Sequence, residues 1–272
     1  MVVYMKVGSL CTGYGGLDMA VEAYFNAEMV WCAENDKYAS KLIEQRFNKL
    51  NYGDIKQIKW DEIEPIDILT AGYPCQPFSQ VGLKKGLQDE RHLFPFVAEA
   101  IRVLRPKLII LENVAAHLRI GFNEVMHELT KLGYDIKWSV ISASEIGALH
   151  NRKRLFIIAY ANSKRLQRSS KKRYTAAELF EVNDGQLAIW ERINGTAPKP
   201  VKNGKSNPQF VEWLMGLPKG WVTDIDLSWT QQIKILGNGV VPQQAYHALE
   251  ILCDSSHISY NETEFANAHS PT

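Results

Sequence analysis

Short apolar runs alternate with amphipathic segments along the first 160 residues of the chain. The amphipathic segments repeat apolar residues at helical spacing, most clearly over residues 93–104. The apolar runs have the length of buried strands, and they occupy residues 6–10, 29–33, 66–70, 108–111, 136–141 and 154–159. Repeated alternation of strand and helix predicts a doubly wound α/β fold with a mostly parallel sheet.

The alternation stops after about residue 160. Residues 161–207 are first basic and then polar, with Trp190 as an isolated aromatic and several glycines and prolines. This segment is a candidate for a small second domain or an inserted recognition region, and the alternative is a linker-like loop. Beyond it, the pattern predicts a helix over residues 208–215. A glycine turn at 236–243 then leads into a last helix that ends near Cys253.

Composition places the chain among soluble globular proteins. It has 272 residues, of which 46% are hydrophobic and 22% are charged. No apolar stretch approaches the ~18–20 residues that a membrane span needs, and the first six residues do not have the pattern of a signal peptide. We therefore expect a cytoplasmic protein without a membrane partner.

Charge is informative only in its distribution. The net charge is +1, which argues neither for nor against nucleic acid. Between residues 148 and 177, however, there are nine basic residues and no acidic one. A solvated surface loop and a patch that follows a phosphate backbone both fit such a run.

The four cysteines are far apart in sequence and form no C-x-x-C pair. We therefore expect reduced thiols, and neither a disulfide nor a metal site. Cys75 differs from the others because it lies between Pro74 and Pro77, directly after an apolar run. Two prolines leave such a residue little backbone freedom. This suits a positioned nucleophile, but the loop alone is equally consistent with a buried structural cysteine.

A glycine loop, Gly13-Tyr14-Gly15-Gly16, lies between the first predicted strand and a helix over residues 17–25. This layout lets backbone N–H groups and a helix N-terminus approach a ligand closely. The spacing is not the G-x-G-x-x-G of dinucleotide sites. A nicotinamide-dependent oxidoreductase is therefore disfavoured, and a plain tight turn remains the alternative.

Acidic residues follow three of the predicted strands. Glu34 lies about 20 residues after the glycines, where a carboxylate can accept hydrogen bonds from ribose hydroxyls. The neighbouring Asn35 or Asp36 can cap the next helix. Asp54 closes a short predicted strand and suits either an adenine amino group or an ordinary turn. Glu112 ends a strand at the edge where parallel α/β sheets carry their chemistry.

Taken together, these residues resemble a known family. Five motifs occur in the order and approximate spacing of the C5 cytosine-specific DNA methyltransferases: Gly13-x-Gly15-Gly16, Pro74-Cys75-Gln76, Glu112-Asn113-Val114, Arg152-x-Arg154 and Gly237-Asn238-Gly239-Val240. The match extends over nearly the whole chain except residues 161–207. It implies a Rossmann-like methyltransferase sheet with a small recognition region inserted before the C-terminal helix.

The resemblance also implies a domain division. Residues 1–160 would form a catalytic domain that binds S-adenosylmethionine, and residues 161–207 a short variable target-recognition region. Residues 208–253 would return to complete the catalytic domain, and we expect residues 254–272 to be a disordered tail.

The resemblance assigns a role to each matched residue. Cys75 would be the nucleophile, and Glu112 would hold the N3 and amino edge of the target cytosine. Arg154, with Arg152 nearby, would contact the base and support that arrangement. The residues implied at the S-adenosylmethionine pocket are Gly13, Tyr14, Gly15, Gly16, Leu17, Glu34, Asn35, Asp54, Ile55, Leu93, Asn238 and Val240. The DNA contacts expected are Gln76, Ser79, Lys84, Lys85, Lys164, Arg165, Arg168, Lys171, Lys172 and Arg173.

The chemistry explains why these residue types are needed. Cytosine C5 is a poor nucleophile until a thiolate adds to C6 and moves electron density to C5. Only a few per cent of an ordinary cysteine is thiolate at pH 7, so its environment must activate it. A carboxyl group at N3 stabilises the charge that builds on the ring. The cytosine must first leave the base stack, which costs a few kcal/mol.

The chain departs from the family pattern at three positions. Cys11, His92 and His150 stand where the family usually has phenylalanine, glycine and glutamine. None of these differences removes a catalytic group. The expected partners are double-stranded DNA and a separate cognate restriction endonuclease, with the enzyme as a monomer in a bacterial or phage modification system. The alternatives are a tRNA cytosine-5 methyltransferase and a catalytically silent DNA-binding protein of the same fold.

Overall fold

The computed structural model describes residues 4–74, 93–161 and 186–253. Its strands are β1 Met5–Leu10, β2 Ala27–Ala33, β3 Leu50–Asn51, β4 Ile68–Ala71, β5 Leu108–Val114, β6 Tyr134–Ser142, β7 Lys153–Ala161, β8 Val201–Lys202 and β9 Lys205–Ser206. Its α-helices are α1 Gly16–Phe25, α2 Lys37–Phe47, α3 Phe94–Leu104, α4 Phe122–Lys131, α6 Gln186–Asn194, α7 Pro208–Leu214, α8 Trp229–Asn238 and α9 Pro242–Cys253. Short 3₁₀ helices occur at Ile55–Gln57, Trp60–Glu62, Ala115–Arg119 and Ala143–Ile146.

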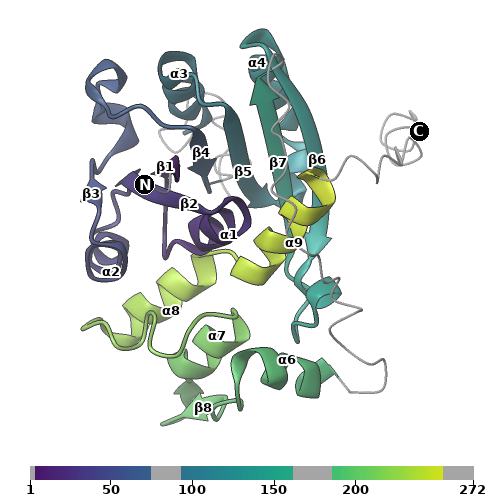
Figure 1. The fold of residues 1–272 in the computed structure, drawn as a ribbon. Helices are drawn as coiled ribbons and strands as arrows, with labels where there is room; N and C mark the ends of the chain where they lie inside the picture. The colour runs from purple at the N-terminus through teal and green to yellow at the C-terminus, as the bar shows by residue number, and fades with distance from the viewer. Residues whose placement is uncertain (1–3, 75–92, 162–185, 254–272) are drawn as a thin grey trace.

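Within the described residues, seven strands form one sheet in the order β3-β2-β1-β4-β5-β7-β6 (Figure 1). The five strands from β3 to β5 are parallel, and β7 runs antiparallel to both of its neighbours, β5 and β6. The six strands predicted from apolar runs are all present. The expected doubly wound, mostly parallel α/β fold is confirmed.

Helices cover both faces of the sheet because alternate strand residues point to opposite sides. Leu69 and Ile109 pack with residues of α3 and α4 in one cluster, whereas Ile68 and Leu108 pack with α1 and α9 in the other. Figure 1 shows α9 lying beside α1, although the two helices come from opposite ends of the chain. The last of the described helices therefore packs against the first.

A third cluster joins the C-terminal part of the chain to the glycine loop. Tyr14 and Leu42 are buried with Trp213 of α7 and with Ile235 and Leu236 of α8. Two buried glycine contacts make this junction tight. A Cβ atom at Gly16 would overlap the carbonyl oxygen of Val240, and one at Gly239 would overlap the ring of Tyr14. Glycine is needed at both positions for steric reasons.

Three local predictions were wrong. Asp54 does not close a strand, because β3 ends at Asn51 and Asp54 caps a 3₁₀ helix. Gly237 is part of α8, so the predicted turn at 236–243 begins only after Asn238. Trp190 is not an isolated aromatic in an irregular segment. It lies on α6, is fully buried, and its indole N–H donates to the carbonyl oxygen of Trp213 at 3.1 Å.

Several predictions fall on residues that lie outside the described ranges. They include Cys75, residues 82–86, whose glycines and lysines predict a basic flap, the basic run at 164–173 and the tail at 254–272. Among the described residues, no helix has the length and apolar character that crossing a membrane requires.

The contact between Gly239 and Tyr14 predicts a matched pair of stability changes. Gly239→Ala should lower the free energy of unfolding by about 1–3 kcal/mol, because the new methyl group overpacks a fully buried ring. At Gly237→Ala, two residues earlier in α8, the new methyl group meets no atom within 4 Å, so this variant should be neutral or more stable by up to about 1 kcal/mol. Urea denaturation of both variants measures the difference, and equal midpoints would contradict it.

Candidate active site

The candidate site lies where β1, β4 and β5 end. Leu10 is in register with Ala71, and Ala71 is in register with Leu111. The residues that follow, Gly72 and Glu112 among them, therefore lie side by side at one edge of the sheet. A Cβ atom at Gly72 would lie 3.5 Å from Oε2 of Glu112. The register of the sheet alone thus brings Gly72, three residues before Cys75, close to the Glu112 carboxyl group.

The glycine loop is held by a carboxylate from the neighbouring strand. Oε2 of Glu34 accepts the Gly13 N–H at 2.9 Å, and Oε1 accepts the Asp36 N–H at 2.8 Å. Burial raises the pKa of Glu34, and the backbone donors oppose that rise. Asn35 is exposed. Each Glu34 oxygen retains a further lone pair, so the carboxylate can still accept hydrogen bonds from a ligand.

Tyr14 joins the glycine loop to the return segment. Its hydroxyl donates to the carbonyl oxygen of Val240 at 2.6 Å, and its side chain is fully buried. Val240 thus comes to the loop through its backbone, while its side chain is buried in the sheet core. Asn238 is exposed at the end of α8, and Leu17 is buried in the first turn of α1.

Two further residues expected at the cofactor, Ile55 and Leu93, lie in one cluster. Ile55 is buried in the core beside α3, and Leu93, at the start of that helix, packs against the same cluster. Asp54 accepts the Lys56 N–H at 3.0 Å, so it serves as a helix cap. This matches the alternative interpretation of Asp54 as an ordinary turn residue.

Glu112 and Arg154 form a buried ion pair. Nε of Arg154 lies 2.8 Å from Oε1 of Glu112, and their side chains are only 13% and 11% exposed. Arg154 pairs with Val114 across the antiparallel ladder, two residues from the partner of Glu112. The two side chains are therefore diagonal neighbours on one face of the sheet. Burial raises the pKa of Glu112, and the nearby Arg154 and Arg152 charges oppose the rise.

Arg152 has a different set of contacts. Its Nη2 donates to the carbonyl oxygens of Gly237 and Gly239, each at 2.8 Å, whereas its Nε is buried without a hydrogen-bond partner in the described part of the chain. The guanidinium therefore fixes the turn between α8 and α9 to the start of β7. The resemblance instead implied that Arg152 lies near Arg154 beside the target cytosine.

The chain leading to Cys75 is anchored as far as the structure describes it. Nδ2 of Asn113 donates to the carbonyl oxygen of Tyr73 at 3.1 Å, and the Tyr73 hydroxyl lies 3.0 Å from Nε2 of His117. Both aromatic side chains are buried. Cys75 itself lies outside the described residues. The described anchors bring the start of its loop beside Glu112.

Two of the other cysteines are poor nucleophiles. Burial raises the pKa of the Cys11 thiol to about 12 and that of Cys32 to about 12, so both stay protonated at neutral pH. Among the described residues, no group of three or more His, Cys, Asp and Glu side chains could hold a metal ion.

Sequence reasoning missed a buried acid beneath the glycine loop. Asp18 is 1% exposed in the first turn of α1 and accepts a hydrogen bond from the Thr70 hydroxyl at 2.6 Å. Burial raises the pKa of Asp18 to about 6. The available signal was an aspartate in an otherwise apolar helix start that faces a strand ending in threonine.

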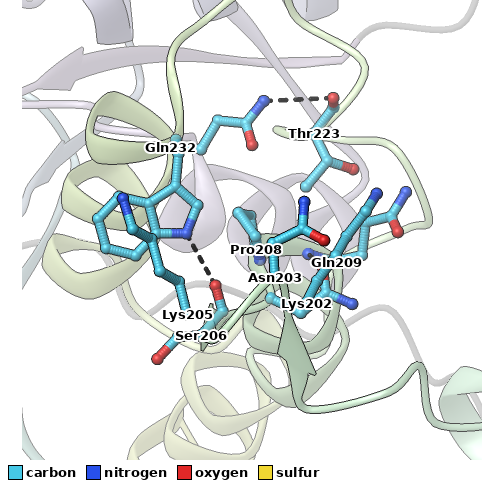
Figure 2. A pocket seen from close by; sticks show the side chains of 10 residues that line it. Lys202, Asn203, Lys205, Ser206, Pro208, Gln209, Thr223 and Gln232 are labelled. Carbon is cyan, nitrogen blue, oxygen red and sulfur yellow. Dashed lines mark hydrogen bonds between the residues drawn. The ribbon is translucent and has the colours of Figure 1, made fainter.

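A polar hollow lies in the C-terminal part of the chain (Figure 2). Its volume is about 540 Å³, and the β8–β9 hairpin lines it together with the starts of α7 and α8. Lys202 and Lys205 come from the hairpin, and Gln232 donates to the carbonyl oxygen of Thr223 at 3.3 Å across it. None of the residues predicted for catalysis or cofactor binding lines this hollow.

Comparison of the sequence with known proteins identifies related chains. A sequence model of the C-5 cytosine-specific DNA methylase family matches residues 5–212. The chain is 36% identical over 163 residues to the Type II methyltransferase M.HhaI of Haemophilus parahaemolyticus, which covers 58% of this chain and 50% of the relative. It is 36% identical over 166 residues to M.Bsp6I of Bacillus sp. (strain RFL6), covering 58% and 53%. The chain thus matches only about half the length of these curated relatives.

Similar folds occur among solved structures. The Dnmt2 methyltransferase of S. pombe superposes with a TM-score of 0.66 at 18% identity, covering 90% of this chain and 98% of that one. The methyltransferase EhMeth of Entamoeba histolytica gives 0.65 at 20% identity, covering 92% and 98%. At these identities the likeness concerns the fold alone.

The raised pKa of Asp18 predicts a pH-dependent stability. An aspartate titrates near 3.9 when unfolded and about 6 here, so its stabilising contribution is fully present below pH ~4 and is lost as pH rises through 6. Relative to Asp18→Asn, the wild type should lose about 2–3 kcal/mol between pH 4 and pH 7. Urea unfolding across that range measures it. Asp61→Asn, at an exposed aspartate, is the control, and an unchanged pH slope in Asp18→Asn would contradict the assignment.

Proposed function

Because the chain belongs to the C-5 cytosine-specific DNA methylase family, we propose that it transfers a methyl group from S-adenosylmethionine to C5 of a cytosine in duplex DNA. The observation that carries the proposal is the buried Glu112–Arg154 pair beside Gly72. This pair provides a carboxyl group for the cytosine ring at the point where the Cys75 loop begins. The likeness to Type II methyltransferases supports a role in DNA modification.

The described residues fit S-adenosylmethionine. Glu34 is fixed by two backbone N–H groups and keeps acceptor capacity for ribose hydroxyls. A Cβ atom at Gly13 would meet no atom within 4 Å, so the loop has open space beside it. Ile55 offers an apolar contact for the adenine, and Leu93, in the same cluster, would touch the cofactor through its backbone. When bound, the cofactor supplies an electrophilic methyl group.

The protein residues would act on the cytosine after it leaves the base stack. The Cys75 thiolate forms a bond to C6, and the electron pair of the C5–C6 double bond shifts onto C5 and, through C4, towards N3. Glu112, whose pKa burial raises, stabilises the charge that builds at N3, either by donating a proton to N3 or by electrostatic interaction. Arg154 holds the carboxyl group in position through the ion pair. After C5 is methylated, a base removes the C5 proton, the thiolate leaves from C6, and any proton gained at N3 returns to Glu112.

The domain division follows the same proposal. Residues 1–160 and 208–253 form the catalytic domain, and residues 161–207 form the target-recognition region. The described part of that region includes the β8–β9 hairpin with Lys202 and Lys205, which suits a phosphate backbone (Figure 2). The remaining DNA contacts would come from the Cys75 loop, the flap that follows it and the basic run at 164–173. A separate restriction endonuclease would be the partner of a monomeric enzyme.

The function is tested by transfer of a tritiated methyl group to DNA. Mixed-sequence duplex DNA should become labelled, whereas tRNA should not. Labelling of tRNA alone would favour the RNA alternative, and absence of label from both would favour a silent DNA-binding protein. Bisulfite sequencing of the labelled duplex reports the methylated sequence context.

Cys75→Ser should abolish turnover, because a serine hydroxyl is far less ionised than a thiol at neutral pH. Binding of S-adenosylmethionine, measured by calorimetry, should persist. Duplex DNA that contains 5-fluorocytosine should trap the wild type covalently but not this variant. Normal activity in Cys75→Ser would rule out the covalent route.

Glu112→Gln should slow methyl transfer by about 10²–10³-fold, because an amide can neither transfer a proton to N3 nor carry the charge of the carboxylate. The Kd of the cofactor should stay within about twofold of the wild type. Glu44→Gln, at an exposed glutamate on α2, is the matched control and should leave the rate unchanged. Equal rates in the two variants would exclude Glu112 from the chemistry.

A further inference from the structure

An indole N–H from the return segment is bonded to the glycine loop. Nε1 of Trp221 donates to the carbonyl oxygen of Tyr14 at 2.9 Å, across 207 residues of sequence. The Tyr14 carbonyl belongs to the peptide that precedes Gly15, a residue in the left-handed region with φ 81°. The Gly15 N–H of the same peptide donates to the carbonyl oxygen of Thr12 at 2.9 Å. Both polar atoms of this loop peptide are therefore fixed by the protein.

The end of α2 holds the Trp221 side chain. The ring of Phe47 meets the Trp221 ring edge to face at 5.6 Å between centroids, and the Arg46 guanidinium lies over the indole at 5.5 Å. Nε of Arg46 also donates to the Trp221 carbonyl oxygen at 2.8 Å, and its Nη2 donates to the carbonyl oxygen of Gly220. Residues at the end of α2 thus hold Trp221 through both its indole ring and its backbone.

A buried carboxylate fixes the turn that carries Trp221. Glu212 of α7 is 1% exposed and accepts the N–H groups of Gly220, Val222 and Thr223 at 2.7, 2.6 and 2.9 Å. It also accepts the Thr223 hydroxyl at 3.0 Å. Four donors on the carboxylate offset the cost of burying its charge. They all come from the turn on either side of Trp221, so Glu212 sets the turn rather than binding a ligand.

We propose that Trp221 is a positioning residue for the cofactor loop and that Glu212 acts through it. This inference rests on the proposed function, because it takes the glycine loop to be the S-adenosylmethionine site. Trp221 holds the Tyr14–Gly15 peptide in its binding orientation before the cofactor arrives. The loop therefore pays less conformational entropy when the ligand binds. The series of contacts from Glu212 through Trp221 to the Tyr14 carbonyl, called the relay below, begins on α7. This helix comes directly after the proposed target-recognition region.

Trp221→Phe tests the proposal, because it keeps an aromatic ring and removes the N–H donor together with one ring of the indole. The Kd of S-adenosylhomocysteine, measured by calorimetry on the full chain without DNA, should rise about five- to tenfold. In turnover assays the KM for S-adenosylmethionine should rise likewise, with kcat within about twofold. Trp229→Phe is the matched control, because Nε1 of Trp229 also donates to a backbone carbonyl, that of Ser206, at 2.8 Å. Its cofactor Kd should not change.

The relay is tested by combining two substitutions. Glu212→Gln should also raise the cofactor Kd, because the amide group cannot accept all four turn hydrogen bonds. If Glu212 acts through Trp221, the effect of the double variant on Kd should be close to that of the larger single effect, and not the product of both. Fully multiplicative effects would overturn the relay. Urea denaturation of each variant checks that it is folded under the conditions in which its Kd is measured.

The outcomes separate the inference from the function on which it rests. A wild type that methylates DNA, together with an unchanged Kd in Trp221→Phe, would overturn the positioning role and leave the function intact. Equal increases in Trp221→Phe and Trp229→Phe would also overturn it. A wild type that does not bind S-adenosylhomocysteine would overturn both.

Discussion

The buried ion pair between Glu112 and Arg154 is the interaction on which the rest of the candidate site depends. A lone carboxylate or guanidinium at this depth would carry a large desolvation penalty, so each charge requires the other. The pair exists because β7 runs antiparallel beside β5 and brings its first residues to the carboxyl ends of the parallel strands. The same edge holds Gly72, which leaves space beside the acid. Strand order thus fixes the acid, its counter-ion and the start of the Cys75 loop together.

Most of the sheet could be predicted from sequence because its strands are buried on both faces and are therefore continuous apolar runs. The position of β7 between β5 and β6 could not, since strand order depends on pairing and not on composition. The helix α6 was missed because its residues lie among basic and polar positions, and its one fully buried anchor, Trp190, gives no periodic signal. Asp54 was misplaced because a cap and a strand end share the same residue types.

The candidate site, like the fold, could be predicted from the sequence only in part. Glu34 and Glu112 were found because acids at strand ends follow a general rule of parallel sheets. The contacts of Arg152 and Trp221 were beyond reach, because their acceptors lie 85 and 207 residues away and are backbone carbonyls, which any residue provides. Asp18 escaped notice for a related reason. Its partner, Thr70, is 52 residues away, and only tertiary packing reveals that the pair is buried.

The hydrogen bond between Tyr14 and Val240 has a consequence for biosynthesis. A ribosome produces the glycine loop early and its acceptor 226 residues later. Until Val240 has left the exit tunnel, the Tyr14 hydroxyl has no carbonyl to bond, and α9 cannot cover α1. A nascent chain therefore carries an unfinished glycine loop until Val240 emerges. The order of translation itself delays assembly of the loop until the residues around Val240 have been made.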